Sequence, residues 1–188
     1  MAIGGPFRDV LVAAQTGAPW ALQLLYEDLS PVVAGYLRLQ GLRDVEDHTS
    51  EVFLGVFRNL AAFSGDEAGF RSWVFTIAYR RIVDERRRRG RRPDPQPLVA
   101  ENDPVGGDVE AEALEALGGS WVREALAELT DEQRQVVVLR ILAGLSADEV
   151  AVVIGKRPGA VRVLQHRAVE RLRRALERGR VSDPMGGN

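Results

Sequence analysis

The sequence contains no cysteine among its 188 residues, and only two histidines and two methionines. Without cysteine there are no disulfides and no thiolate metal sites, which fits a protein of a reducing cytosol. No apolar run approaches the roughly 20 residues that a transmembrane helix requires. The first residues, MAIGGPFRDV, lack both the basic and the apolar stretch of a signal peptide. These absences predict a soluble, cytoplasmic protein.

Residues that carry enzymatic chemistry are equally scarce. His48 and His166 lie far apart in the sequence, and there is no phosphate-binding glycine loop and no HExxH motif. The acidic pairs Glu46-Asp47 and Asp66-Glu67 fit a helix start and a loop better than a buried acid–base pair. We therefore predict no catalytic residues, no metal site, no cofactor and no small-molecule substrate.

The net charge of −2 hides a segregation of charge along the chain. Arg80–Arg92 carries eight arginines against two acidic residues, and Lys156–Arg180 carries nine basic residues against two acidic ones. Between them, Pro93–Ser120 carries seven acidic residues and no basic one. Two basic segments separated by an acidic one favour nucleic acid as a partner.

Apolar residues recur at three- and four-residue spacing, and no segment shows the convincing alternation of a β-strand. In the first half of the chain this pattern predicts helices over residues 7–15, 19–40, 44–62 and 70–89. Trp20 and Leu24 are expected on the buried stripe of the second helix, which Pro31 is expected to bend or split.

A segment rich in proline, glycine and acidic residues divides the chain at residues 93–119, where a short helix over 109–117 is compatible with the sequence. We therefore expect an all-α protein of two small helical domains, residues 7–92 and 120–178. We also expect a flexible acidic linker to join them and residues 181–188 to form a disordered tail.

The second domain ends in a pattern typical of a helix-turn-helix. Ser146 and Glu149 have the spacing of a capping box at the start of one helix, and Gly155 ends that helix. Ala151, four residues before the glycine, and Val161, six after it, allow two helices to cross closely. This arrangement leaves the second helix free to enter a major groove.

Four sequence blocks, in this order, resemble the sigma factors of the extracytoplasmic-function (ECF) type, which keep only regions 2 and 4 of larger sigma factors. The blocks that resemble region 2 are LYEDLSPVVAGYLRLQG, EDHTSEVFLGVFRNL and FRSWVFTIAYRRIVDERRRRGRR. The block that resembles region 4 is ALAELTDEQRQVVVLRILAGLSADEVAVVIGKRPGAVRVLQHRAVERLRRAL.

The resemblance implies a protein that binds the largest subunits of core RNA polymerase, recognises −35 and −10 promoter elements and promotes DNA melting. An anti-sigma factor is a further implied partner. The resemblance implies that polymerase binds to polar residues of one helix, Asp47, Ser50 and Glu51. Contacts with the −10 element fall on Phe63, Ser64, Trp73, Arg80, Arg81, Arg86, Arg87 and Arg88. Contacts with the −35 element fall on Arg157, Arg162, Gln165, His166 and Arg167.

Two other classes of protein compete with this interpretation. A transcriptional regulator with a C-terminal helix-turn-helix would bind DNA without joining polymerase, but its receiver domain would need strands that the sequence does not predict. A helical protein-interaction module would explain the arginine run but not the spacing of the helix-turn-helix. An enzyme is the least favoured class, because the chemistry-bearing residues are missing.

Overall fold

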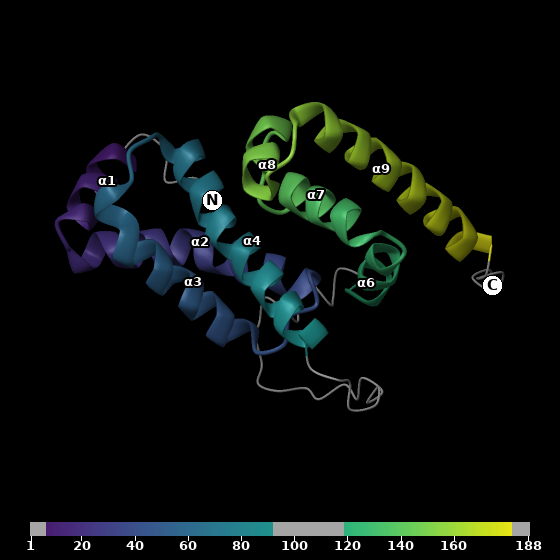
Figure 1. The fold of residues 1–188 in the computed structure, drawn as a ribbon, viewed down its shortest axis with the longest axis horizontal. Coiled ribbons are helices and arrows are strands. Elements are labelled where there is room, and N and C mark those ends of the chain that lie inside the picture. Colours follow the sequence, from purple (N-terminus) through teal and green to yellow (C-terminus); the bar gives the residue numbers. More distant parts are fainter. Residues whose placement is uncertain (1–6, 92–118, 182–188) are drawn as a thin grey trace, which may run out of the picture.

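The computed structural model describes residues 7–91 and 119–181, with side chains described over 7–89 and 122–177. Every regular element within these ranges is helical, which confirms the expected all-α fold. Figure 1 shows the N-terminal helices forming one half of the molecule and the C-terminal helices forming the other. Of the expected linker (residues 93–119) and tail (181–188), only Gly119 and Val181 are described, as the first residue of α6 and the last residue of α9. The rest of both segments, including the expected helix at 109–117, lies outside the described residues.

The N-terminal half is a bundle whose helices bury the predicted apolar stripes. Its elements are α1 (Phe7–Gln15), α2 (Pro19–Leu39), α3 (Val45–Asn59), the short 3-10 turn η1 (Leu60–Ala62) and α4 (Glu67–Arg91). Leu25, Val56 and Ile82, from three different helices, are fully buried where these stripes meet. Each such side chain contributes about 1.5–3 kcal/mol by leaving water, so the shared core holds the bundle together.

Helix α2 differs from expectation at its first turns and is continuous at its proline. It is not split at Pro31, and the residues two positions before and two positions after the proline, Leu29 and Val33, are both buried in the same core. Packing on both sides of the proline therefore holds the helix to the bundle. Trp20 and Leu24 are 58% and 38% exposed, so the prediction that they belong to the buried stripe is wrong.

The C-terminal half consists of α6 (Gly119–Ala127), α7 (Asp131–Ile141), α8 (Ala147–Ile154) and α9 (Pro158–Val181). Thr130 caps α7 through a complete capping box: its hydroxyl accepts from the Gln133 backbone N–H, and the Gln133 side chain accepts from the Thr130 N–H. Lys156, in the turn between α8 and α9, forms an ion pair with Glu132 at 2.8 Å. This pair fixes the turn of the helix-turn-helix to the start of α7.

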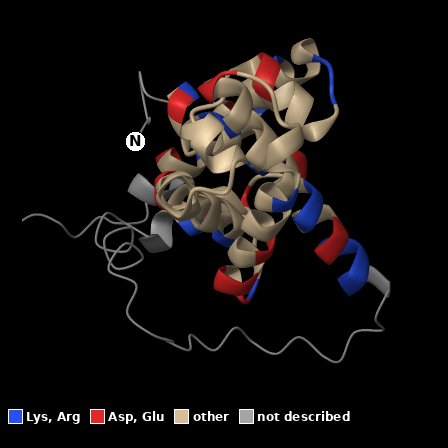
Figure 2. Ribbon diagram, turned by 90° about the vertical axis from the view of Figure 1, so that its left-hand side faces the viewer, with Lys and Arg blue, Asp and Glu red and all other residues tan. Residues whose placement is uncertain are grey.

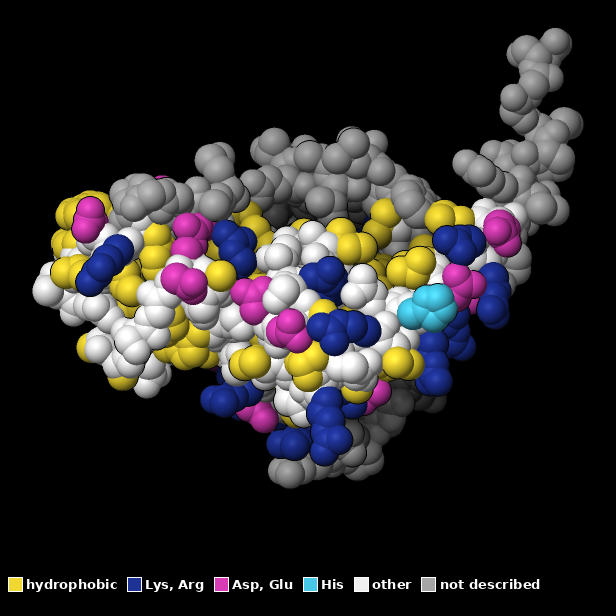
Figure 3. All heavy atoms as spheres, turned by 90° about the horizontal axis from the view of Figure 1, so that it is seen from above, with side chains coloured by type: hydrophobic (Ala, Val, Ile, Leu, Met, Phe, Trp, Pro, Cys, Tyr) yellow, Lys and Arg dark blue, Asp and Glu magenta, His cyan; other side chains and the backbone are white. Residues whose placement is uncertain are grey.

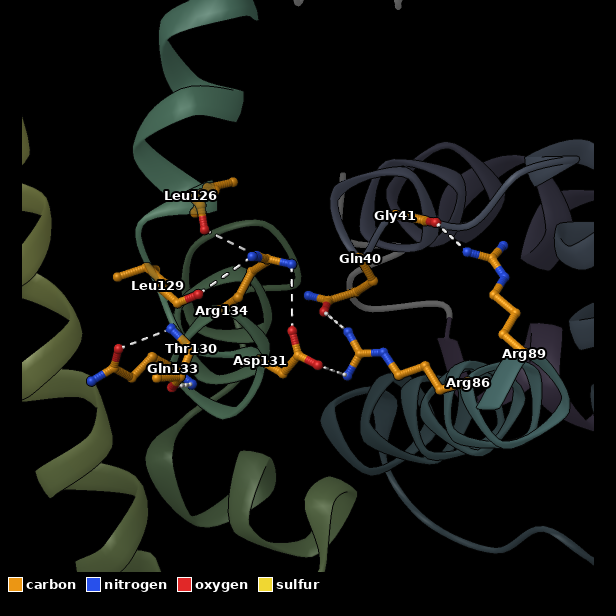
Figure 4. A network of polar contacts seen from close by, with 10 residues as sticks. All are labelled: Gln40, Gly41, Arg86, Arg89, Leu126, Leu129, Thr130, Asp131, Gln133 and Arg134. Carbon is orange, nitrogen blue, oxygen red and sulfur yellow. Dashed lines mark hydrogen bonds and ion pairs between the residues drawn. The ribbon is translucent and has the colours of Figure 1, made fainter. Parts of the chain in front are cut away.

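The two halves pack directly on each other. Helix α4 lies against α8, α2 touches α7, and one continuous cluster of buried hydrophobic residues runs through both halves. The Leu142 side chain lies so close to Gly35 that a Cβ atom there would come within 3.2 Å of Leu142 Cδ2. At the other end of α7, Arg86 of α4 pairs with Asp131 at 3.3 Å and donates to Gln40 at 3.3 Å (Figure 4).

Candidate nucleic-acid interface

Helices α8 and α9 have the geometry of a helix-turn-helix. Both halves of the predicted capping box form: the Ser146 hydroxyl accepts from the Glu149 N–H, and the Glu149 carboxylate accepts from the Ser146 N–H. Gly155 ends α8 in the left-handed conformation, at φ 66°, where a side chain would be strained. Ala151 and Val161 are both buried at the crossing of the two helices. The predicted spacing therefore produces the predicted motif.

The outer face of α9 is basic, and Lys and Arg side chains gather along the edge of the molecule that this helix forms (Figure 3). Arg162 is exposed and lies 3.4 Å from Asp148 of α8, an exposed pair that solvent screens. Gln165 is half-buried, and its side-chain oxygen accepts a hydrogen bond from Arg140 Nε at 3.2 Å. The remaining members of the expected −35 set are exposed: Arg157, His166 and Arg167.

The expected −10 loop packs on a cluster of three aromatic rings. Phe63 is stacked on Trp73, with ring centroids 5.0 Å apart and an interplanar angle of 25°. Both rings also contact the buried Phe70, at 5.3 Å and 5.8 Å. Ser64, which follows Phe63, is exposed. The sequence-predicted residues Phe63, Ser64 and Trp73 are therefore close together, with the half-buried Phe63 next to the exposed Ser64.

Most arginines near the end of α4 form ion pairs within the chain, unlike arginines at a helix end that contact only solvent. Acidic and basic positions lie mixed over the described surface (Figure 2), and several arginines have partners within the chain. Arg81 pairs with Glu51 and donates to His48 Nδ1 at 3.2 Å, while Arg86 pairs with Asp131 across the two halves. Farther along, the acidic partners are at 3.9 Å or closer, in the pairs Arg87–Asp84, Arg88–Glu85 and Arg89–Glu85. Arg80 is exposed.

Neither a metal site nor a membrane span is found within the described ranges. Over residues 7–91 and 119–181, no three His, Asp or Glu side chains cluster in a way that would hold a metal ion. In the same ranges no helix is both long and apolar enough to cross a membrane.

Comparison with known proteins identifies both halves of the molecule. A family model described as Sigma-70 region 2 matches residues 25–92, and one described as Sigma-70, region 4 matches residues 120–172. The chain is 33% identical over 182 residues to the ECF RNA polymerase sigma factor SigD of Mycobacterium tuberculosis, covering 92% of this chain and 85% of that protein. The chain belongs to the ECF sigma factors of the sigma-70 family.

Other relatives agree with this assignment. The ECF RNA polymerase sigma factor BldN of Streptomyces coelicolor is 34% identical over 171 residues, or 89% of this chain, and the match spans 65% of BldN. The solved structure of CnrH in complex with the cytosolic domain of CnrY aligns with a TM-score of 0.67 at 25% identity, over 90% of this chain and 96% of that one. RpoE of Bartonella quintana, solved with the anti-sigma factor NepR, shares the fold at a TM-score of 0.65 and 18% identity, over 82% and 96% of the two chains.

The expected polymerase-docking residues of this sigma factor lie on one exposed strip of α3. Asp47, Ser50 and Glu51 are all exposed at helical spacing. Leu54 continues the strip and is 52% exposed, which sequence periodicity did not single out. Glu51 also forms the ion pair with Arg81, so the strip on α3 is connected to the arginines of α4.

Two polar side chains of the sigma factor make contacts that sequence reasoning missed. Gln15, the last residue of α1, donates to the backbone carbonyls of Leu60 and Phe63, at the start of the expected −10 loop. Arg140 holds Gln165 and also donates to the Leu145 carbonyl. A single Gln or Arg at the end of a helix has no pattern that reveals its long-range partner, so only the folded structure exposes these roles.

Proposed function

We propose that this sigma factor binds core RNA polymerase, recognises the −35 and −10 elements of a promoter and promotes DNA melting. The single observation that carries the proposal is the exposed basic face of α9 on a well-formed helix-turn-helix, within the match to region 4. In this proposal, residues 7–92 and 120–178 are the functional domains, and residues 93–119 tether them.

In this proposal, α9 is the recognition helix that binds the duplex of the −35 element. Arg162 is the strongest candidate for a base contact, because a guanidinium can donate to both acceptors of guanine in the major groove. Arg157 and Arg167 suit phosphates, which position the helix without reading sequence. His166 and Gln165 complete the set, with Gln165 held at the edge of the face by Arg140.

Melting at the −10 element falls to the loop after η1 and to α4. An unpaired base can stack on an aromatic ring, and Phe63 offers a half-exposed ring supported from behind by Trp73. Ser64 can donate to or accept from the edge of that base. The arginines Arg80, Arg81, Arg86, Arg87 and Arg88 would hold phosphates. For the paired ones, a phosphate must replace the acidic partner within the chain.

Polymerase is proposed to dock on the strip of α3 that carries Asp47, Ser50 and Glu51, in the cytoplasm. An anti-sigma factor is a further proposed partner: CnrH was solved with the cytosolic domain of CnrY, and RpoE of Bartonella quintana, which shares the fold, was solved with the anti-sigma factor NepR. The comparisons do not favour a helix-turn-helix regulator that acts without polymerase, because two separate sigma regions match in order.

Run-off transcription with purified core polymerase tests the proposal. The sigma factor is expected to co-elute with core and to support initiation from genomic promoter fragments. Arg162→Glu should reduce −35-dependent initiation on the order of tenfold or more, as expected for losing one good base contact. Arg174→Glu, an exposed arginine farther along the same helix, is the matched control. A protein that neither joins core nor initiates on any fragment would contradict the proposed function.

A further inference from the structure

Helix α1 ends directly beside the expected −10 loop. The Gln15 side-chain amide donates from Nε2 to the carbonyl oxygen of Leu60 at 3.0 Å and to that of Phe63 at 2.7 Å. These carbonyls belong to the first residue of η1 and to the first residue of the loop. One side chain from the start of the chain therefore closes both ends of the turn that leads into the loop.

The same helix also supports the loop through aromatic contacts. Phe7, at the other end of α1, packs on Phe70 with ring centroids 5.6 Å apart. Phe70 in turn contacts Phe63 and Trp73, the two stacked rings of the expected −10 site. Helix α1 thus fixes the loop twice, through its rings and through the Gln15 amide.

The loop is held at its far end as well. The Asp66 carboxylate accepts from the Gly69 backbone N–H at 2.8 Å, which caps the first turn of α4. Gly65 lies against the Phe63 ring so closely that a Cβ atom there would come within 3.0 Å of Cζ. Between these two anchors, Ser64 is left exposed. The loop is therefore ordered before any nucleic acid arrives.

We propose that Gln15 is a positioning residue for −10 recognition: its amide holds the Phe63 backbone so that Phe63 and Ser64 face the unpaired base in a fixed geometry. The proposal rests on the proposed function of the loop. Helix α1 lies before the segment matched to Sigma-70 region 2, which begins at residue 25, so the family match assigns it no part. Without the amide, the loop would have to become ordered each time a base binds. The entropy cost of this ordering would weaken binding of the base and reduce the discrimination between bases.

Two substitutions remove the contact in different ways. Gln15→Leu keeps the size of the side chain but cannot donate, and Gln15→Glu places a carboxylate that can only accept against two carbonyl oxygens. Gln23→Leu is the matched control, because Gln23 is exposed on α2 and its side-chain amide donates to Glu27, at 2.7 Å, on the same helix rather than to the loop. Each variant is first checked for co-elution with core polymerase.

The deciding measurement is the base preference of open-complex formation by the reconstituted holoenzyme, with each −10 position changed in turn. Both Gln15 variants should lower open-complex formation on the duplex promoter by about tenfold, as expected for one or two lost hydrogen bonds. They should also flatten the preference among bases, and a promoter with a pre-opened bubble should recover most of the lost activity. Gln23→Leu should match the wild type.

The outcomes separate the two proposals. If the wild type forms no open complex on any promoter, the proposed function itself fails. If the wild type initiates but both Gln15 variants keep its full preference among bases, the positioning role of Gln15 is overturned, whatever the loss of stability. A uniform loss on all promoters, including those with a pre-opened bubble, would assign Gln15 to general stability instead and would also overturn the proposal.

Discussion

Tyr36 shows at the scale of one residue how the two halves are joined. Its ring is fully buried and meets Phe75 edge-on, with ring centroids 5.5 Å apart. Its hydroxyl donates to the Gln135 side-chain oxygen, from α2 to α7. Burial, and secondarily the nearby Tyr79, raise the pKa of the Tyr36 hydroxyl far above its usual value, while Arg86 acts in the opposite direction. The phenol therefore stays protonated and available as a donor.

Replacing Tyr36 with Phe is expected to destabilise the protein by about 1–3 kcal/mol, because the buried Gln135 oxygen loses its donor. The Gln135 Nε2 atom already lacks a hydrogen-bond partner within the described residues, so this amide is poorly satisfied from the outset. Urea unfolding at neutral pH measures the effect. Tyr26→Phe is the control, because Tyr26 is 38% exposed and its change should stay within about 0.5 kcal/mol.

The same tyrosine gives the unfolding free energy a pH dependence of known sign. The unfolded chain ionises Tyr36 near pH 10, whereas the folded chain keeps it protonated. Below pH 10 both states carry the proton and the contribution is constant. Above it the unfolded state binds fewer protons, so stability falls by up to about 1.4 kcal/mol per pH unit. The Phe variant should lose this part of the alkaline slope. An unchanged slope would contradict the assignment to Tyr36.

At the scale of the helices, local signals predicted most of the fold correctly. The ends of α1 and α8 fall where the stop signals place them, because each end is fixed by contacts within a few residues. Helix α4 begins at Glu67, three residues earlier than apolar spacing indicates, because Asp66 caps its first turn through a side chain. The contacts of Gln15 and Arg86 could not be predicted, since both join segments more than 40 residues apart.

Helix α8 depends on its caps more than longer helices do, because it has only eight residues. Ser146→Ala removes the acceptor for the Glu149 N–H and should cost about 1 kcal/mol of unfolding free energy. Glu149→Gln is the matched control, because glutamine serves the same position of a capping box and keeps the acceptor. Chemical denaturation compares the two variants. Equal midpoints and slopes for Ser146→Ala and the wild type would show that the box contributes nothing.

The whole molecule is packed too tightly to serve two separated promoter elements at once. Helix α8 packs against both α4 and α9, so the axes of the two helices proposed to bind DNA are at most about 20 Å apart where they meet α8, at 8–10 Å per helix pair. The elements named −35 and −10 lie about 25 base pairs apart, or roughly 85 Å of duplex at 3.4 Å per step. The Arg86–Asp131 pair also occupies an arginine proposed to hold phosphate. Promoter binding under the proposed function therefore requires the halves to separate.

A reversible covalent bridge between the halves tests this requirement. Gly35→Cys combined with Leu142→Cys places two thiols at the contact between α2 and the end of α7, and the sequence contains no other cysteine. A short bismaleimide linker with a cleavable disulfide should then lower promoter-dependent initiation by more than about tenfold. The bridged halves would stay within the distance of packed helices, which is too short to reach both promoter elements.

Adding reductant should restore initiation, which excludes damage to the fold. The two single-cysteine variants, treated in the same way, cannot be bridged and should be unaffected. Full initiation by the bridged protein would mean that both elements are engaged without separation, and that the contact between α2 and α7 persists on the promoter.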